Sequence, residues 1–161
     1  MPLRPLPHAR PRKTLHRRQR YAELEAPFLA YRRELSPSEP GTPGEFALLA
    51  AEWQNDPDRW LWWGINEAGE RVGFVIFRKF RDFPDRRKWV GSIAEFTILP
   101  AHRRKGHGRA LVRRAIEELK AAGCAKVEAA VLWERSVSLA FWEAAGFRPV
   151  YVLTELDVSS R

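Results

Sequence analysis

The residues with the clearest chemical meaning lie in a basic, glycine-containing segment, residues 98–110. The segment begins where an apolar stretch ends at Pro100, and it precedes an amphipathic helical pattern that starts at His107. The first backbone N–H groups of a helix have no intrahelical acceptor, and together with the helix dipole they attract anions. Glycine at 106 and 108 leaves room for an anion near the backbone. The basic side chains here are Arg103, Arg104, Lys105 and Arg109. The segment therefore predicts a site for a phosphate-bearing ligand.

Two well-known phosphate-binding loops do not match this segment. A P-loop ends in Gly-Lys-Ser or Gly-Lys-Thr, a run that the segment lacks. The dinucleotide fingerprint requires a third glycine, at a position where this chain has Leu111. The ligand is therefore expected to differ from those of both motifs.

Glu95 is the candidate general base, because it is the only acidic residue in the range 89–111. It lies on a predicted strand, residues 89–99. If Phe96 and Ile98 face the core, strand alternation places Glu95 on the opposite face. That face also carries Thr97 and Leu99. A carboxylate there would remove a proton from an amine, directly or through water. The alternative is a solvated or ion-paired strand glutamate.

Periodicity and turn residues predict the elements of the first half of the chain. They are a candidate edge strand at 1–6, a helical pattern at 12–35 interrupted at Pro27, a Pro/Gly loop at 36–44, a helix at 45–55, a hairpin of strands at 60–65 and 71–78, and a charged loop at 79–88. The loop at 36–44 is interpreted either as a mobile segment over a site or as an exposed connector.

The second half alternates between strands and helices. We predict helices at 107–122 and 136–145, strands at 125–131 and 147–157, and C-terminal helix caps at Gly123 and Gly146. Together with the first half this pattern indicates one α/β (α+β) domain over residues 1–161. Its central sheet is expected to be mixed, mostly antiparallel and flanked by helices.

Composition and charge narrow the function classes. The 161 residues carry a net charge of +8, and residues 1–20, with seven basic residues and no acidic one, supply seven of these charges. A nucleic-acid partner is therefore not favoured for the chain as a whole. The single cysteine excludes an internal disulfide framework and suits a cytoplasmic location. No apolar run approaches the length of a membrane span, so no membrane partner is expected.

The pattern Arg103-x-x-Gly106-x-Gly108 resembles the acetyl-coenzyme A loop of the GCN5-related N-acetyltransferase (GNAT) superfamily. The context agrees, because the loop follows a hairpin and a strand ending in Pro100, and a later helix ends in Gly146-Phe147. The resemblance covers about residues 60–148. It implies a fold whose splayed strands hold acetyl-CoA. It also implies an N-acetyltransferase that moves an acetyl group to a primary amine by direct attack in a ternary complex.

The same resemblance implies which residues form the site. Strand contacts to pantetheine fall on Phe96, Thr97, Ile98 and Leu99. Contacts to the pyrophosphate fall on Arg103, Arg104, Lys105, Gly106, His107, Gly108, Arg109 and Ala110. The Ile98 N–H would stabilise the oxyanion, and Glu95 stands where members often carry a base. No metal is expected, because no His, Asp or Glu cluster has ligand spacing.

Two departures from the family pattern leave the proton donor to the leaving thiolate open. Trp142 stands where many members have a tyrosine, and Arg135 stands where an asparagine is common. Water, Ser138 or Tyr151 would serve as donor, or none is needed. Two other function classes also remain. One is a nucleic-acid-binding module that uses the basic N-terminus, and the other is a non-catalytic acyl-CoA sensor.

Several further expectations concern the surface and the core. The loop at 79–88 carries five basic and two acidic residues, which indicates either an anionic acceptor or a solvated loop. The short stretch after Phe147 suggests that the sheet lacks a strand or completes its edge in a homodimer. Trp60, Trp62 and Cys124 are expected to pack in the core. His102 is expected on the surface, and His107 is expected to act through its backbone.

Overall fold

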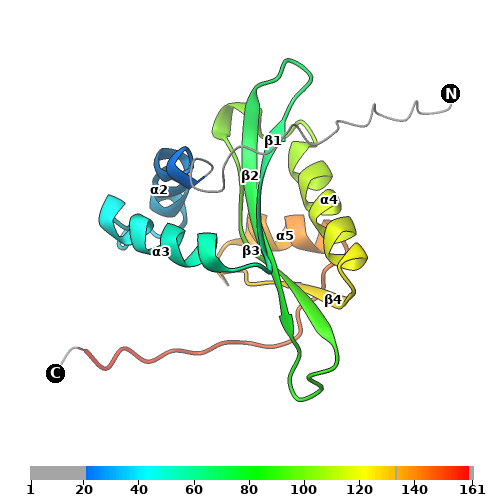
Figure 1. The fold of residues 1–161 in the computed structure, drawn as a ribbon. Helices are drawn as coiled ribbons and strands as arrows, with labels where there is room; N and C mark the ends of the chain where they lie inside the picture. The colour runs from blue at the N-terminus through cyan, green and yellow to red at the C-terminus, as the bar shows by residue number, and fades with distance from the viewer. Residues whose placement is uncertain (1–20, 133, 160–161) are drawn as a thin grey trace, which may run out of the picture. The chain divides into compact units, whose positions relative to one another are not determined.

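The computed structural model describes residues 21–132 and 134–159 (Figure 1). The chain divides into two compact units, which meet in the sequence between Arg59 and Trp60. The candidate edge strand at 1–6 and the basic residues 1–20 lie outside the described residues. In the described part of the chain, none of the helices is long and apolar enough to cross a membrane.

The first unit contains two helices, α2 (Glu25–Leu35) and α3 (Pro43–Asn55). They are joined through aromatic contacts. The Phe28 ring lies 5.3 Å from Phe46 and 5.5 Å from Trp53, the latter edge-on. Edge-to-face pairs of this kind add about 0.5–1.5 kcal/mol to the burial of the rings. All three side chains are buried, so they form the core of this unit.

Some predicted boundaries in this unit were wrong. The helical pattern is interrupted at Glu23 and Leu24, and Pro27 lies in the first turn of α2. A proline ring clashes with the carbonyl four residues earlier and has no N–H, so the break precedes it. The Pro/Gly loop ends at Thr42, because α3 begins with Pro43.

The second unit is built on a four-stranded mixed sheet in the order β1-β2-β3-β4. The strands are β1 (Arg59–Ile65), β2 (Arg71–Arg81), β3 (Trp89–Ile98) and β4 (Cys124–Ala129). β2 and β3 are antiparallel, whereas β3 and β4 are parallel. The helices are η1 (Pro100–His102), α4 (His107–Ala121) and α5 (Ser136–Ala144). The predicted α+β class, with a mixed sheet flanked by helices, is confirmed.

The core of this unit lies between α4 and the sheet (Figure 1). The apolar stripe of α4 is buried there, at Leu111, Val112, Ala115 and Leu119. Phe77 of β2 lies in the same cluster. The Trp60 ring stacks on Phe77 at 5.2 Å and the Trp62 ring meets it edge-on at 4.9 Å. Core packing of these two tryptophans is therefore confirmed.

A β-bulge divides β3 into two halves. Ile93 is opposite Phe77 and Glu95 is opposite Ile76, so Ala94 is an extra residue on β3. A bulge changes which face of the sheet the following side chains occupy. Ile93 and Phe96, three positions apart, consequently both join the core cluster under α4.

Three predicted segments of this unit differ from the structure. β2 continues to Arg81, so the charged loop starts three residues later than predicted. β4 ends at Ala129 instead of residue 131. The predicted strand at 147–157 is wrong, because these residues have no secondary structure. Alternation predicts a strand only if a partner pairs with its N–H and C=O groups, and no described strand does so.

Candidate active site

The second half of β3 has backbone groups that no strand of the described residues pairs on one side. β4 pairs with β3 only as far as Ile93. β2 runs along the other side, where the Leu99 N–H donates to the Val72 carbonyl at 2.8 Å. Hydrogen-bonded and non-hydrogen-bonded pairs alternate in an antiparallel ladder, so the N–H and C=O of Ile98 point away from β2. The same holds for Phe96, two residues earlier. Both residues direct main-chain groups to the side of β3 on which β4 no longer pairs. We call the space beside this stretch of β3, past the last β4 pairing at Ile93, the opening.

The opening leads to the N-terminus of α4, which no side chain caps. Gly106 is the N-cap, in a left-handed conformation with a φ of 83° that favours glycine, and the first turn holds no acidic residue. The other well-formed N-terminus shows the contrast. In α3, Thr42 accepts a hydrogen bond from the Glu45 N–H at 3.2 Å, and the Glu45 carboxylate accepts one from the Thr42 N–H at 2.7 Å. The first N–H groups of α4 are therefore available to an anionic ligand.

The basic side chains of the loop have different positions. The Arg103 Nε donates to the Ile98 carbonyl at 2.8 Å, which ties the loop to the end of β3. The Lys105 Nζ donates to the Ala101 carbonyl at 3.1 Å. Arg104 and Arg109 are exposed, and Arg104 has a φ of 64°. All four contribute positive potential at the start of α4, but Arg103 also has a structural role that the sequence did not predict.

Gly108 is required for packing. A Cβ at this position would lie 3.2 Å from Phe96 Cζ, 3.3 Å from Phe141 Cε2 and 3.4 Å from Ile98 Cγ1. This packing is a second reason for glycine at 108, and the predicted access of an anion to its backbone stays a prediction. At Gly106 a Cβ would meet nothing within 4 Å, so there the left-handed backbone is what calls for glycine.

Glu95 lies on the face of β3 opposite α4. Phe96 and Ile98 belong to the core cluster under α4, so alternation places Glu95 and Thr97 on the other face, as predicted. Glu95 is half-buried, and its cross-strand neighbour Ile76 is fully buried. The carboxylate therefore stands beside apolar surface next to the opening. Its role as a base stays a prediction.

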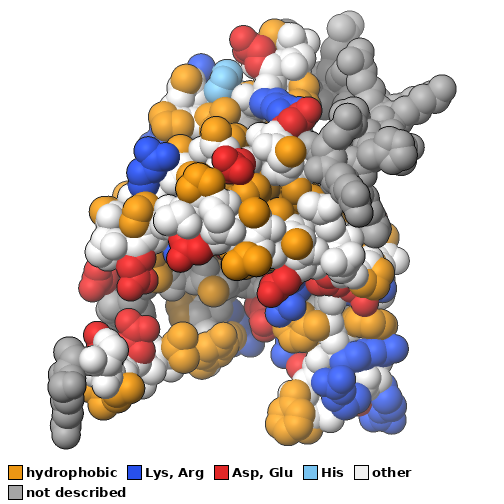
Figure 2. Space-filling model, turned by 60° about the vertical axis from the view of Figure 1, so that its left-hand side comes forward, with side chains coloured by type: hydrophobic (Ala, Val, Ile, Leu, Met, Phe, Trp, Pro, Cys, Tyr) orange, Lys and Arg blue, Asp and Glu red, His pale blue; other side chains and the backbone are white. Residues whose placement is uncertain are grey.

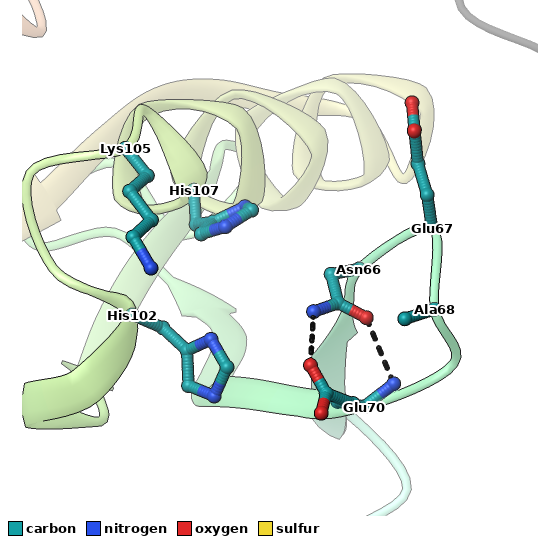
Figure 3. Close-up of a pocket in the computed structure, with 7 residues that line it drawn as sticks. All are labelled: Asn66, Glu67, Ala68, Glu70, His102, Lys105 and His107. Carbon is teal, nitrogen blue, oxygen red and sulfur yellow. Dashed lines mark hydrogen bonds between the residues drawn. The ribbon is translucent and has the colours of Figure 1, made fainter.

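A pocket of about 420 Å³ lies between the β1–β2 turn and the segment that leads into α4 (Figure 3). Its lining comprises Asn66, Glu67, Ala68, Glu70, His102, Lys105 and His107. Figure 3 shows the carboxamide of Asn66 bonded to Glu70, whose carboxylate accepts from Asn66 Nδ2 at 2.7 Å. The sequence missed this pocket. The β1–β2 turn comes close to His102 and His107 because β2 pairs with β3. No local sequence motif indicates that pairing.

The two histidines of this pocket lie near each other. The rings of His102 and His107 are 6.3 Å apart, and both residues are half-buried. The surface position expected for His102 is therefore found only in part, since this residue lines the pocket. The His107 side chain lines the pocket while its N–H belongs to the first turn of α4. In the described part of the chain, no three His, Cys, Asp or Glu side chains form a group that could hold a metal ion.

Trp142 has a packing role. Its ring lies 5.8 Å from Phe96, 5.3 Å from Phe141 and 4.9 Å from Phe147. The Phe96 and Phe141 rings stack at 5.3 Å. These contacts bind α5 to the half of β3 that β4 does not pair. An indole also has no acidic proton to give a thiolate. Of the other candidate donors, Ser138 is half-buried and Tyr151 is 73% exposed, beyond the last helix.

The basic loop of the β2–β3 hairpin lies at the start of β3. Gly106 follows the other end of that strand. The Lys79 ammonium and the Arg81 guanidinium lie 4.4 Å and 3.8 Å from the centre of the Trp89 ring. Basic side chains gather on the lobe at the lower right of Figure 2.

Cys124 lies half-buried at the start of β4, and burial raises the pKa of its thiol, although the nearby Lys79 opposes this. It packs against the core cluster, as predicted.

Among the described residues, the second half of β3 is paired on one side only and leads into the uncapped N-terminus of α4, an arrangement in an α+β fold that suits an extended anionic ligand. The model of the acetyltransferase (GNAT) family matches residues 18–147 of the chain. This match covers most of the chain, which therefore belongs to that family.

Three individual proteins that resemble this chain each share about a third or less of the residues in the matched stretch. A mycothiol acetyltransferase from Beutenbergia cavernae is 33% identical over 98 residues, which are 61% of this chain and 32% of that protein. The match thus spans about a third of the length of that relative. An acetyltransferase from Trypanosoma brucei is 23% identical with a TM-score of 0.65, over 91% of this chain and 97% of that one. A ribosomal-protein-alanine N-acetyltransferase from Brucella melitensis is 19% identical with a TM-score of 0.66, over 89% and 96%. The two structures support the fold.

Proposed function

We propose that this chain is an acetyl-CoA-dependent N-acetyltransferase that transfers an acetyl group to a primary amine in a ternary complex. One observation carries the proposal. The half of β3 left without a partner on the β4 side leads directly into the uncapped N-terminus of α4. Membership in the acetyltransferase family supports the same reading. The single cysteine suits a reducing, cytoplasmic setting for this activity.

The end of β3 suits the pantetheine arm of coenzyme A, and the loop that leads into α4 suits its pyrophosphate. The pantetheine arm carries amide groups, which would pair with the main chain of Phe96 and Ile98 as an added strand does. Thr97 and Leu99 alternate with them along the same stretch. The pyrophosphate is anionic and would accept hydrogen bonds from the amides of the loop and the first turn of α4. The loop and first-turn residues are Arg103, Arg104, Lys105, Gly106, His107, Gly108, Arg109 and Ala110.

Amine acceptors need to lose a proton. A lysine-like amine has a pKa near 10.4, so about one in 2,500 is neutral at pH 7, and deprotonation then costs about 4–5 kcal/mol. Glu95 is the carboxylate beside the opening, and we assign it the role of general base, directly or through water. Acetyl-CoA supplies the acetyl group as a thioester, with a thiolate as leaving group.

The Ile98 N–H is assigned to the developing negative charge on the acetyl oxygen. Its direction follows from the antiparallel ladder, which turns it away from β2 into the opening. A preorganised donor of this kind is worth about 3–4 kcal/mol of transition-state stabilisation. The Arg103 bond to the Ile98 carbonyl restrains the neighbouring Ile98–Leu99 peptide, which limits movement of the strand end that carries this N–H.

The direct test is turnover by Glu95→Gln. If Glu95 takes the proton, release of the coenzyme A thiol with an amine acceptor falls by about 10²-fold or more, while acetyl-CoA binding measured by calorimetry is unchanged. Glu128→Gln is the matched control, since Glu128 is a half-buried glutamate on the neighbouring strand β4. It is expected to keep full turnover. Equal activity of wild type and Glu95→Gln would remove Glu95 as the base.

The acceptor is identified by a panel. It comprises an aminoglycoside, peptides with a free N-terminal alanine, lysine peptides and free amino acids, with thiol release as the signal. Binding of acetyl-CoA without turnover on any amine would favour an acyl-CoA sensor. Tight binding of duplex DNA at roughly 150 mM salt, with no binding of acetyl-CoA, would instead favour the nucleic-acid module.

A further inference from the structure

Residues 149–158 form an extended apolar segment that pairs with no strand of the described residues. One face of this segment carries Val150, Val152, Leu156 and Val158, which are 69%, 71%, 83% and 81% exposed. β-Branched residues are the ones that sheets favour. Figure 1 shows the segment, in red, running outward from α5 to the C-terminus, and Figure 2 shows it at the lower left. An exposed face of four large apolar side chains, interrupted by Thr154 alone in this segment, indicates a surface that pairs with another.

The sheet of the same chain offers an edge that such a segment fits. β4 is the last strand in the sheet order, and it pairs with β3 alone among the described strands. The N–H and C=O groups on its outer edge are a template for an added strand. β4 contains no proline that would block pairing.

Charge complementarity supports one orientation. Segment 149–158 carries Glu155 and Asp157 and no basic residue. The start of β4 has positive neighbours, because Lys79 is close enough to act on the Cys124 thiol. Lys126 on the strand is also cationic, although its ammonium lies 3.4 Å from the Asp82 carboxylate. An antiparallel arrangement places the acidic end of the segment beside the start of β4 and its valines beside the end. Opposite charges across a strand pair are stabilising.

We propose that two copies of this chain exchange residues 149–158, each segment adding antiparallel to the outer edge of the partner's β4. The start of the segment is anchored at the end of α5, where the Phe147 N–H donates to the Trp142 carbonyl at 3.0 Å. From there the residues from 148 to 159 are all exposed, so the segment lies away from its own sheet. A twofold exchange pairs both segments and both edges at once.

The exchange would also stabilise the opening beside β3. β4 pairs with β3 only between Trp89 and Ile93, and a strand on its second edge would hold it in place. This inference concerns assembly and does not depend on the proposed acetyl transfer. Its tests therefore measure mass and cross-links, which an inactive protein would show equally well.

The first experiment is light scattering on the full chain. A dimer is expected for wild type, and the double variant Val152→Lys and Leu156→Lys is expected to be a monomer. Leu48→Lys is the control, because this leucine is 72% exposed on α3, and it should remain a dimer. Circular dichroism confirms that each variant is folded. A monomeric wild type, or a double variant that stays dimeric, would overturn the proposal.

The second experiment distinguishes exchange from pairing within one chain. Val158→Cys places a thiol on the segment, and the native Cys124 stands at the start of β4. Because burial raises the pKa of the Cys124 thiol, oxidation is carried out at alkaline pH. Exchange predicts a covalent dimer on a non-reducing gel, and one that Val158→Cys combined with Cys124→Ser does not form. A cross-link inside a single chain, or no cross-link at all, would contradict the exchange.

Discussion

At the scale of single residues, the site depends on small side chains and on main-chain groups more than on charged ones. Gly106 permits the left-handed turn, and Gly108 lets α4 approach β3 and α5. Arg103 uses its guanidinium on a backbone carbonyl at the end of β3. The cationic character of the loop, which is its most visible property in the sequence, is thus only part of its function.

Gly108→Val tests the packing role. The added methyl groups would press on Phe96 and Phe141, which already lie within 3.4 Å of a Cβ at this position. We expect the free energy of unfolding, measured by denaturant titration, to fall by about 1–3 kcal/mol. Ala110→Val introduces the same side chain at an exposed position of the same helix and should cost about 0.5 kcal/mol. Valine is a better helix former than glycine, so helix propensity alone would stabilise the Gly108→Val variant. A variant as stable as wild type, or more stable, would show that packing at Gly108 is not decisive.

At the scale of elements, the two long helices begin in opposite ways. α3 has a complete capping box between Thr42 and Glu45, whereas α4 has no side-chain cap. The sequence prediction puts Thr42 in a loop and misses the α3 cap, although the run Thr-Pro-Gly-Glu holds a cap and its partner three residues apart. The open start of α4 follows from Gly106, which has no side-chain oxygen that could cap the helix.

Thr42→Ala removes the cap of α3. We expect the free energy of unfolding to fall by about 0.5–2 kcal/mol, because the Glu45 N–H loses its acceptor. Thr42→Ser keeps the hydroxyl and should be close to wild type. The affinity for acetyl-CoA, measured by calorimetry, should not change in either variant. A loss of binding that parallels the loss of stability would contradict the assignment of the ligand to α4.

The sequence predicts elements well where side-chain period and turn residues agree, and less well elsewhere. The stripe from Leu111 to Leu119 and the cap at Gly123 define α4 to within one residue. The last predicted strand has equally good alternation but no partner, and a partner is a property of the tertiary structure. The nearness of His102, His107 and the turn at Asn66 depends likewise on strand register, so it could not be read from spacing.

At the scale of the whole molecule, the family match extends over both compact units, from residue 18 to residue 147. The predicted organisation as one acetyltransferase domain over residues 1–161 stays a proposal. The fold and the family are established by comparison, whereas the ligand and the acceptor are proposed from the geometry of β3 and α4.

Ligand binding should stabilise the compact unit that contains β3 and α4. Acetyl-CoA at about a hundred times its dissociation constant adds about 2.7 kcal/mol to the free energy of unfolding. For a chain of this size that corresponds to a rise in Tm of about 5–10 °C, measured by calorimetry. S-acetyl-N-acetylcysteamine, which has the thioester end but no pyrophosphate, should give a much smaller rise at the same concentration. Equal shifts for the two ligands would show that the loop and the start of α4 do not hold the pyrophosphate.

The surplus residue at Ala94 has a consequence for how this protein tolerates change. The bulge shifts the alternation of side chains along β3 by one residue. Ile93 and Phe96, three positions apart, therefore both face α4. If the bulge were lost and Ala94 took a regular place in the ladder, the carboxylate of Glu95 would turn toward the hydrophobic interior and the Phe96 ring would turn out. Deleting Ala94 would instead keep both side chains on their present faces, because Glu95 would then follow Ile93 directly. The unpaired position of Ala94, a residue with no chemistry of its own, thus keeps Glu95 on the face of β3 away from α4.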